Sequence, residues 1–451
     1  MTEPQASPRR HLGVAHATIL ALGMIMSTDT LKTASTVALN LGHWHFYMAW
    51  VLGGLVSMVG AFSYVEMATA FPDPGGDYRF LTLAYGRFVG LIFAWSRFSI
   101  MHTGWIALMA FLFADYVQAL VPMGAAAHAL FAGATVAALT GLNLTHVRLG
   151  FLTQALLVVL VALGFAAVVA AGITLWLGGA LPTEAPSGAA APGLDQVSVA
   201  FIYIFLAYGG WSDAAVLSAE IRNTRAGMAV TIIGSLALLI LIYLSLNAAM
   251  AAGLGMDGLA RSQAPAAELL ARAFGPVGET LIVAVVGISA IASINSTLIV
   301  GARTTYAAAR DVPALARLGT WESRGVPARA VLAEGAVALA LVGCGSLATS
   351  GFNAMVNYMT PVYWCFLMLS TGAVIILRIR HPEVERPVRT PFYPVLPGAF
   401  FLVAFYMFGA SLADLGVGAL AGAAVMALGA VLAALALRAA PPRLSSARSP
   451  G

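Results

Sequence analysis

Charge, cysteine and lysine are all scarce in this sequence. Only 9% of its 451 residues are Asp, Glu, Lys or Arg, whereas about a quarter are charged in a soluble globular protein. The two cysteines, Cys344 and Cys365, both lie in apolar stretches, so we expect neither a disulfide framework nor a thiolate metal site. The eight histidines are scattered along the chain and form no catalytic cluster. These absences exclude a soluble fold and argue against an enzyme of any kind, including one embedded in a membrane.

What the sequence does contain is hydrophobic, at 60% of its residues. About twelve stretches are long enough to cross a bilayer core, which takes about 20 helical residues. The arginines lie in short loops at every second boundary between these stretches and are not gathered in one patch. This spread argues against nucleic acid as a partner, and by the positive-inside rule it predicts that both termini are cytoplasmic. We therefore expect an all-α polytopic membrane protein whose surroundings are the lipid bilayer.

The first apolar stretch, residues 16–40, carries an unusual polar centre. Both of its ends are apolar, but two turns in the middle hold Ser27, Thr28, Asp29, Thr30 and Lys32. A charged side chain at the bilayer centre costs roughly 2.5 to 3.5 kcal/mol on insertion scales, so such residues are retained where they face a cavity. We predict a transmembrane helix that is interrupted at a binding site.

A second interrupted helix is predicted over residues 196–219. Gly209 and Gly210 each lower helix propensity by about 1 kcal/mol relative to Ala, and Asp213 lies near mid-span. Broken helices in first and sixth position indicate two five-helix inverted repeats, as in secondary transporters of the leucine-transporter type. The expected order is a cytoplasmic tail (1–10), a first repeat (11–180), an external linker (181–194), a second repeat (195–380), two further helices (381–438) and a cytoplasmic tail (439–451).

Four stretches resemble one family of permeases. They are PDPGGDYRFLTLAYGRFVGLIFAW (72–95), AYGGWSDAAVLSAEIRNTRAGM (207–228), ISAIASINSTLIVGARTTYAAARD (288–311) and RTPFYPVLP (389–397). In the same order, they are similar to segments of bacterial amino acid permeases in the L-type branch of the amino acid, polyamine and organocation superfamily. The resemblance implies a secondary active transporter in the bacterial cytoplasmic (inner) membrane, moving an amino acid or related amine by alternating access.

The resemblance also implies where the substrate binds. In this family the substrate carboxylate meets amides of broken helix 1, and its ammonium meets carbonyls of broken helices 1 and 6. A half-helix N-terminus suits an anion because its N–H groups are unsatisfied. The matching positions here are Ser27, Thr28, Asp29 and Thr30 in helix 1, and Leu206, Tyr208, Gly209, Gly210 and Trp211 in helix 6. By the same analogy, His102 and Thr103 of helix 3 face the cavity.

Three positions depart from the family pattern. Asp29 replaces a glycine and would repel a substrate carboxylate unless it were protonated, bound to a cation or paired with Lys32, three residues further on. Leu206 replaces an aromatic gate, which predicts a roomier closure, and Val161 replaces a lysine that stands in for a sodium ion. A hard cation facing helix 1 would suit the oxygens of the helix 8 residues Ser289, Ser293 and Asn295.

Some roles stay open at this point. Asp29 either contacts a cationic group of the substrate, a proton or a sodium ion, or forms a structural pair with Lys32. Asp213 either lines the site or bonds the backbone amides freed by the break. Arg97 is expected to snorkel or to pair with a carboxylate such as that of Glu66.

Two rivals to an ordinary amino acid carrier follow from these residues. One is a carrier for a cationic amine or polyamine recognised through Asp29, and the other is a transporter-like sensor that binds without moving solute. In each case the expected partner is a small molecule, with no obligate protein partner and no cofactor other than a coupling proton or sodium ion.

Overall fold

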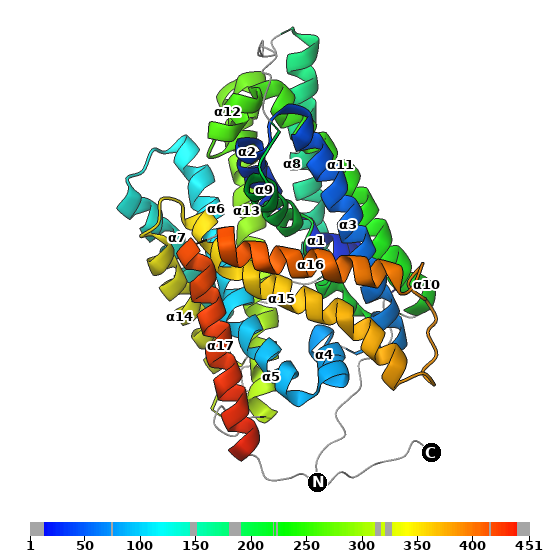
Figure 1. Cartoon of the computed structure of the whole chain (residues 1–451). Helices are drawn as coiled ribbons and strands as arrows, with labels where there is room; N and C mark the ends of the chain where they lie inside the picture. The colour runs from blue at the N-terminus through cyan, green and yellow to red at the C-terminus, as the bar shows by residue number, and fades with distance from the viewer. Residues whose placement is uncertain are drawn as a thin grey trace.

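The computed structural model describes residues 13–73, 75–144, 151–179, 191–219, 221, 224–311, 317–320, 327–414 and 416–439. Within them the chain is folded into a bundle of helices (Figure 1). Their bounds are α1 Val14–Ile25, α2 Thr30–Asn40, α3 His43–Ala70, α4 Asp77–Tyr85, α5 Arg87–Ser96, η1 Arg97–His102, α6 Thr103–Leu120, α7 Ala125–Asn143, α8 Phe151–Leu177, α9 Leu194–Ala207, η2 Asp213–Ala219, α10 Thr224–Ala229, η3 Val230–Gly234, α11 Ser235–Leu254, α12 Met256–Arg261, α13 Pro265–Asp311, α14 Ala328–Gly345, α15 Gly351–Arg380, α16 Val395–Asp414 and α17 Gly416–Ala439.

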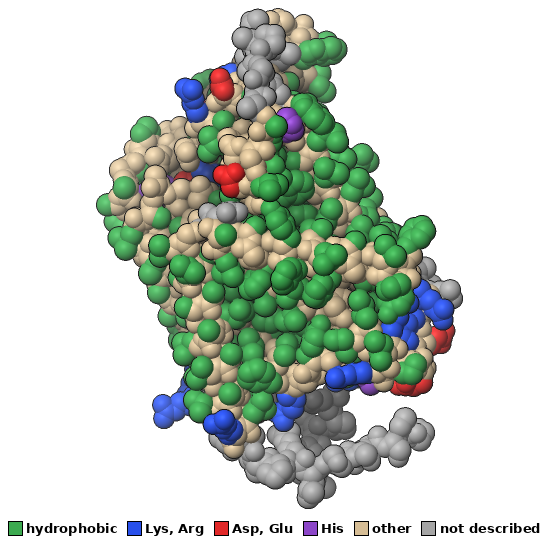
Figure 2. All heavy atoms as spheres, viewed as in Figure 1, with side chains coloured by type: hydrophobic (Ala, Val, Ile, Leu, Met, Phe, Trp, Pro, Cys, Tyr) green, Lys and Arg blue, Asp and Glu red, His purple; other side chains and the backbone are tan. Residues whose placement is uncertain are grey.

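Ten stretches of the described helices are long and apolar enough to cross a membrane. Two shorter apolar helices, Val14–Gly23 and Leu194–Ala207, belong to the two broken helices, and counting each broken helix as one crossing gives the expected total of about twelve. Figure 2 shows hydrophobic side chains over the middle of the visible face, with most charged side chains near its two ends. The predicted all-α polytopic membrane protein is confirmed.

Helix 1 is broken where its sequence is polar. The helix α1 ends at Ile25, and α2 begins at Thr30. The backbone turns extended at Met26, with φ of −76° and ψ of 101°, which ends the helical hydrogen bonding. The interruption predicted for residues 16–40 is confirmed. The N–H groups of Leu31 and Lys32 donate to the Thr28 and Asp29 carbonyls, so the amides that the break leaves without a helical partner lie before Leu31.

Helix 6 is broken by a turn over Tyr208 to Ser212, between the end of α9 and the short 3₁₀ segment η2. Gly210 has a φ of +87°, a conformation that glycine adopts without steric penalty. This confirms the second predicted interruption. Most of the predicted external linker, 181–194, lies outside the described residues, as do the predicted tails apart from Ala439.

Helix 3 is not one continuous α-helix. It consists of α5, a π-helical turn η1, and α6. A π turn holds an extra residue and often marks a functional site. The hydropathy of the segment carries no trace of this turn, because one additional residue leaves the apolar content unchanged.

The broken half-helix α2 lies at one end of the bundle. It packs against α9, α12 and α13, and Figure 1 shows α2 and α12 near the top of the view and α4 near the bottom. We call these the upper and lower ends. At the lower end, Glu66 of α3 accepts hydrogen bonds of 2.7 Å from both Nε and Nη2 of Arg378 and from the backbone N–H of Thr390. This bidentate pair ties α3 to α15.

Candidate functional site

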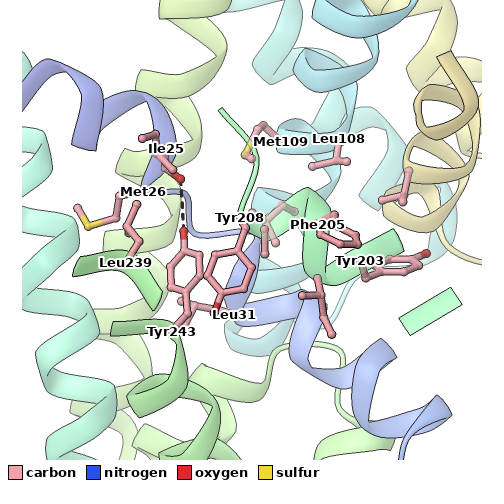
Figure 3. Packing of buried hydrophobic residues seen from close by; sticks show 14 of the residues in the cluster. Ile25, Met26, Leu31, Leu108, Met109, Tyr203, Phe205, Tyr208, Leu239 and Tyr243 are labelled. Carbon is pink, nitrogen blue, oxygen red and sulfur yellow. Dashed lines mark hydrogen bonds between the residues drawn. The ribbon is translucent and has the colours of Figure 1, made fainter. Parts of the chain in front are cut away.

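The break in helix 1 is held open by one tyrosine of α11. The hydroxyl of Tyr243 accepts a hydrogen bond of 3.2 Å from the Ser27 backbone N–H and donates one of 3.3 Å to the Ile25 carbonyl. Figure 3 shows this hydroxyl pointing at Ile25, with the Tyr208 ring alongside. The two rings lie 5.4 Å apart between centroids. Tyr243 thus joins the two broken helices at one point.

Asp29 is the most unusual group at this break. Its side chain is 0% exposed, and neither carboxyl oxygen has a hydrogen-bond partner among the described residues. The carboxyl lies beside the Ser27 hydroxyl and the amides of Asp29 and Thr30, but the geometry is not that of a helix cap. Because an ionised carboxylate in such a place costs on the order of several kcal/mol, the arrangement favours a proton or a bound cation.

Lys32 does not pair with Asp29, so that alternative is wrong. Its Nζ lies 2.8 Å from Oδ2 of Asp115 in α6, and it donates hydrogen bonds of 3.0 and 2.9 Å to the backbone carbonyl and Oε1 of Gln263. The α2 helix turns the lysine toward the upper end of α6, away from the break. Sequence spacing alone indicated the nearer acid, and the tertiary fold supplies a more distant one.

Three oxygen groups of helix 8 were expected to face helix 1, and one of them has a hydrogen bond to it. The Thr28 hydroxyl donates to Ser289 Oγ at 3.3 Å. Ser293 instead accepts from Trp105 Nε1 at 2.9 Å, and the Asn295 side-chain oxygen accepts from Asn143 at 2.7 Å. Of the three groups, Ser289 is therefore the one with a described hydrogen bond to helix 1, and a cation site formed by all three stays a prediction.

The helix 6 residues divide between two surroundings. Tyr208 is fully buried, donates to the Trp50 carbonyl at 3.2 Å and packs beside Tyr243. Trp211 packs edge-on against Tyr64, with ring centroids 5.0 Å apart. Leu206 packs on the buried core. At Gly209 a β-carbon would lie 3.0 Å from the Leu206 carbonyl oxygen, a tight contact that the backbone would have to relieve by a few tenths of an ångström.

A charged pair connects helix 3 to helix 6. Arg97, at the start of η1, donates to Asp213 Oδ1 at 2.8 Å and to His102 Nε2 at 2.9 Å. Arg97 therefore pairs with Asp213 rather than with Glu66. In this structure the Asp213 carboxylate is the partner of the Arg97 guanidinium. The Asp213 side chain is 48% exposed, so this pair borders open space. Thr103, next to His102, is fully buried, and its hydroxyl has no hydrogen-bond partner within the described residues.

Asp77 of α4 is a further buried acid below this pair. It is 7% exposed and accepts a hydrogen bond of 2.9 Å from the Ser370 hydroxyl. Burial raises the pKa of Asp77 to about 6, against the opposing effects of its hydrogen bonds and of the Arg97 charge. Since α4 is too short to cross a membrane, this carboxyl titrates near the lower end.

Two further ionisable groups were not singled out in the sequence. Glu334 of α14 is fully buried, with Thr305 donating to Oε1 at 3.3 Å and no described partner for Oε2. Asp115 is the partner of Lys32. Each is an isolated acid in an otherwise apolar span, which was a readable signal. Tyr243 had no such signal, because a tyrosine in a span is usually a packing residue.

Comparisons with known proteins agree with this geometry. A family model described as amino acid permease matches residues 12–439. The b(0,+)-type amino acid transporter 1 of Mus musculus is 24% identical over 408 residues, which are 89% of this chain and 82% of that protein. The Asc-type amino acid transporter 1 of Mus musculus is 25% identical over 394 residues, covering 84% and 73%. The large neutral amino acids transporter small subunit 2 of Homo sapiens is 25% identical over 410 residues, covering 87% and 74%. The similarity thus extends over both broken helices.

Proposed function

The chain belongs to the amino acid permease family, and from this premise we propose that it binds its substrate between the two broken helices and moves it together with a proton. Its relatives are transporters and not enzymes, so the protein is a permease that moves amino acids across a membrane. The finer steps, from the binding residues to the coupling ion, are our proposal.

The substrate site lies between the break at Ser27 to Thr30 and the turn at Leu206 to Trp211. The start of α2 offers amides to the substrate carboxylate, and the end of α9 offers carbonyls to its ammonium. Both breaks meet at the Tyr243 and Tyr208 rings. His102, Thr103 and Asp213 extend the site toward helix 3.

The observation that carries the coupling proposal is the complete burial of the Asp29 carboxyl with no compensating positive charge and no hydrogen bond to either oxygen among the described residues. An ionised Asp29 would repel a carboxylate bound at the start of α2, whereas a protonated one would donate a hydrogen bond to it. Substrate and proton therefore bind together, and both leave together when the site opens on the other side. This arrangement couples the amino acid to the proton gradient in one step.

A proton fits this site better than a sodium ion does. Sodium is a hard cation that takes several oxygen ligands, and the Thr28 and Ser289 hydroxyls are the only pair of the expected group that meets near helix 1 in the described residues. Asp29 as a proton acceptor needs no further ligand.

We propose a location in the bacterial inner membrane, in keeping with the resemblance to bacterial permeases, and the distribution of arginines supports cytoplasmic termini. In that orientation the upper end faces outward. We further expect the chain to work without an obligate protein partner, which transport by the purified single chain would test.

Uptake into proteoliposomes tests the proposal. Neutral, acidic and cationic amino acids and simple polyamines are each supplied with a pH gradient, a sodium gradient or neither. We expect a zwitterionic or acidic amino acid to accumulate with the pH gradient alone. Accumulation driven by sodium alone would refute proton coupling, and transport of polyamines without amino acids would refute the assigned substrate class.

A further inference from the structure

The chain's only lysine belongs to a buried polar cluster that the substrate site does not include. Lys32 of α2 forms an ion pair with Asp115 of α6 at 2.8 Å, and the two side chains are 6% and 16% exposed. The contact is an ion pair and not an aligned hydrogen bond, since Asp115 Oδ2 accepts none. Two hydrogen bonds to Gln263 complete the surroundings of the ammonium.

Asp115 is itself held in place from a fourth element. Its other oxygen, Oδ1, lies 2.9 Å from Nε2 of His128 in α7. The His128 ring stacks on Phe111 of α6, with ring planes 15° apart. Each carboxyl oxygen of Asp115 thus faces one partner, and the aspartate cannot turn away from Lys32 without losing His128.

The cluster joins one half-helix to three neighbours. Lys32 is on α2, which the break separates from α1, whereas Asp115, His128 and Gln263 belong to α6, α7 and the segment between α12 and α13. Gln263 is exposed and Lys32 is 5% exposed, so the cluster lies just below the surface of the upper end. Asp29 lies on the same segment, about one helical turn from Lys32.

These contacts oppose any movement of α2 away from α6. Eight of the eleven residues of α2 are buried and cover the break from that side, so an opening toward the upper end that moved α2 would separate Lys32 from Asp115. In the closed arrangement both charges are desolvated and compensate each other, and in the open arrangement both are hydrated. Removing one charge leaves the other buried without compensation, which destabilises the closed arrangement alone.

We propose that Lys32 and Asp115 form a latch that keeps the upper side of the substrate site closed, with His128 and Gln263 positioning it. Lys32 and Asp115 do not touch the substrate. They set the equilibrium between the closed and the upper-open arrangement, and thereby the rate at which the site becomes accessible from that end. The inference rests on the proposed function only in assuming that the site opens alternately to two ends.

The test measures access and not transport, so that failure of the latch and failure of the proposed function are distinguishable. A cysteine is placed at Ser35, which lies on α2 one turn above Lys32 and is 7% exposed, in a chain carrying Cys344→Ser and Cys365→Ser. The protein is held in lipid nanodiscs, where both faces are reachable, and the rate of labelling by a charged maleimide is followed.

We expect Lys32→Met and Asp115→Asn each to speed labelling about tenfold, within the usual range of conformational coupling. The double variant removes both charges and should label more slowly than either single variant, since no uncompensated charge remains buried. Arg272→Met is the control. It removes another cation, one that donates to the Gly253 carbonyl and has no described hydrogen bond or ion pair with α2, and it should leave the rate unchanged.

Unchanged labelling in both single variants would overturn the latch, and so would single-variant effects that simply add in the double variant. Misfolding is checked with a second buried cysteine, Ala107→Cys in α6, which the latch does not protect. A misfolded variant would label as fast at position 107 as at position 35. If transport proves to be uncoupled from protons while these rates follow the expected pattern, the latch stands and only the coupling proposal fails.

Discussion

Replacing Asp29 by asparagine separates the two parts of the proposed coupling. The amide has nearly the shape of the protonated acid and can donate a hydrogen bond to a substrate carboxylate, but it cannot release a proton. We therefore expect Asp29→Asn to bind and exchange substrate at every pH, and to lose the ability to accumulate it against a gradient.

The size of the effect follows from the burial of the group. Because the carboxyl is fully buried and unpartnered among the described residues, its ionised form excludes the substrate. The apparent affinity of the natural protein should then fall about tenfold for each pH unit above the point where Asp29 ionises. The affinity of Asp29→Asn should be constant over the same range.

Accumulation gives a second measurement. With one proton carried per substrate, a gradient of about one pH unit supports roughly tenfold accumulation in proteoliposomes, which corresponds to about 1.4 kcal/mol. The variant should reach equal concentrations on both sides. Asp195→Asn is the matched control, since Asp195 is an exposed acid in the first turn of the other broken helix.

One result would refute the reasoning directly. If Asp29→Asn accumulates substrate with the pH dependence of the natural protein, the proton is carried elsewhere and Asp29 is a structural residue. A variant that neither accumulates nor exchanges would instead show that the carboxylate itself contacts the substrate, which also contradicts the proposed order of binding.

Three other changes give distinct expectations. Tyr243→Phe removes the hydroxyl that bridges the break in helix 1. Because the Ser27 N–H and the Ile25 carbonyl then lose their partner, uptake should fall roughly tenfold while the amount of folded protein stays the same. Uptake equal to that of the natural protein would show that the break keeps its geometry without the Tyr243 hydroxyl. Folding raises the pKa of Asp77 from 3.8 to about 6, so the stabilising contribution of its carboxyl is complete below pH 3.8 and is lost as the pH rises through about 6. Asp77→Asn should therefore be more stable than the natural protein above that range, by up to about 3 kcal/mol, and equal to it at acid pH. Thermal unfolding in detergent at several pH values would check this. At Gly422 of α17 a β-carbon would clash with the Tyr358 carbonyl oxygen of α15, whereas at Gly409 it would meet nothing within 4 Å. Gly422→Ala should therefore lower the unfolding temperature, at a cost of about 1 to 3 kcal/mol, and Gly409→Ala should leave it unchanged. Equal unfolding temperatures for the two variants would show that α15 and α17 can move apart at no cost in stability.

Local patterns in the sequence were sufficient for the architecture. The polar run around Asp29 marked the break in helix 1, and the glycines before Asp213 marked the break in helix 6, because main-chain interruption depends on residues next to each other. Hydropathy located the spans for the same reason. The extra residue in η1 escaped this reading because a π turn changes the helix geometry without changing its composition.

Pairing across the bundle could not be predicted in this way. Lys32 has an acid three residues away, but pairs with one 83 positions along the chain, and Arg97 pairs with Asp213 across two helices. These partners are chosen by how the helices pack, and a buried charge selects the compensating group that the packing brings within reach. Only the need for a partner, and not its identity, is visible in the sequence.

The π turn also constrains how the length of helix 3 can change in evolution. A π turn takes up one more residue than an α-helical turn over nearly the same rotation. Deleting one residue between Arg97 and His102 would therefore convert η1 to an α-helical turn and leave α6 close to its present orientation relative to α5, so Trp105 would still lie beside Ser293 and Asp115 beside Lys32. A gap of one residue at this place in a relative thus implies loss of the π turn, with the same set of partners kept on helices 1 and 8.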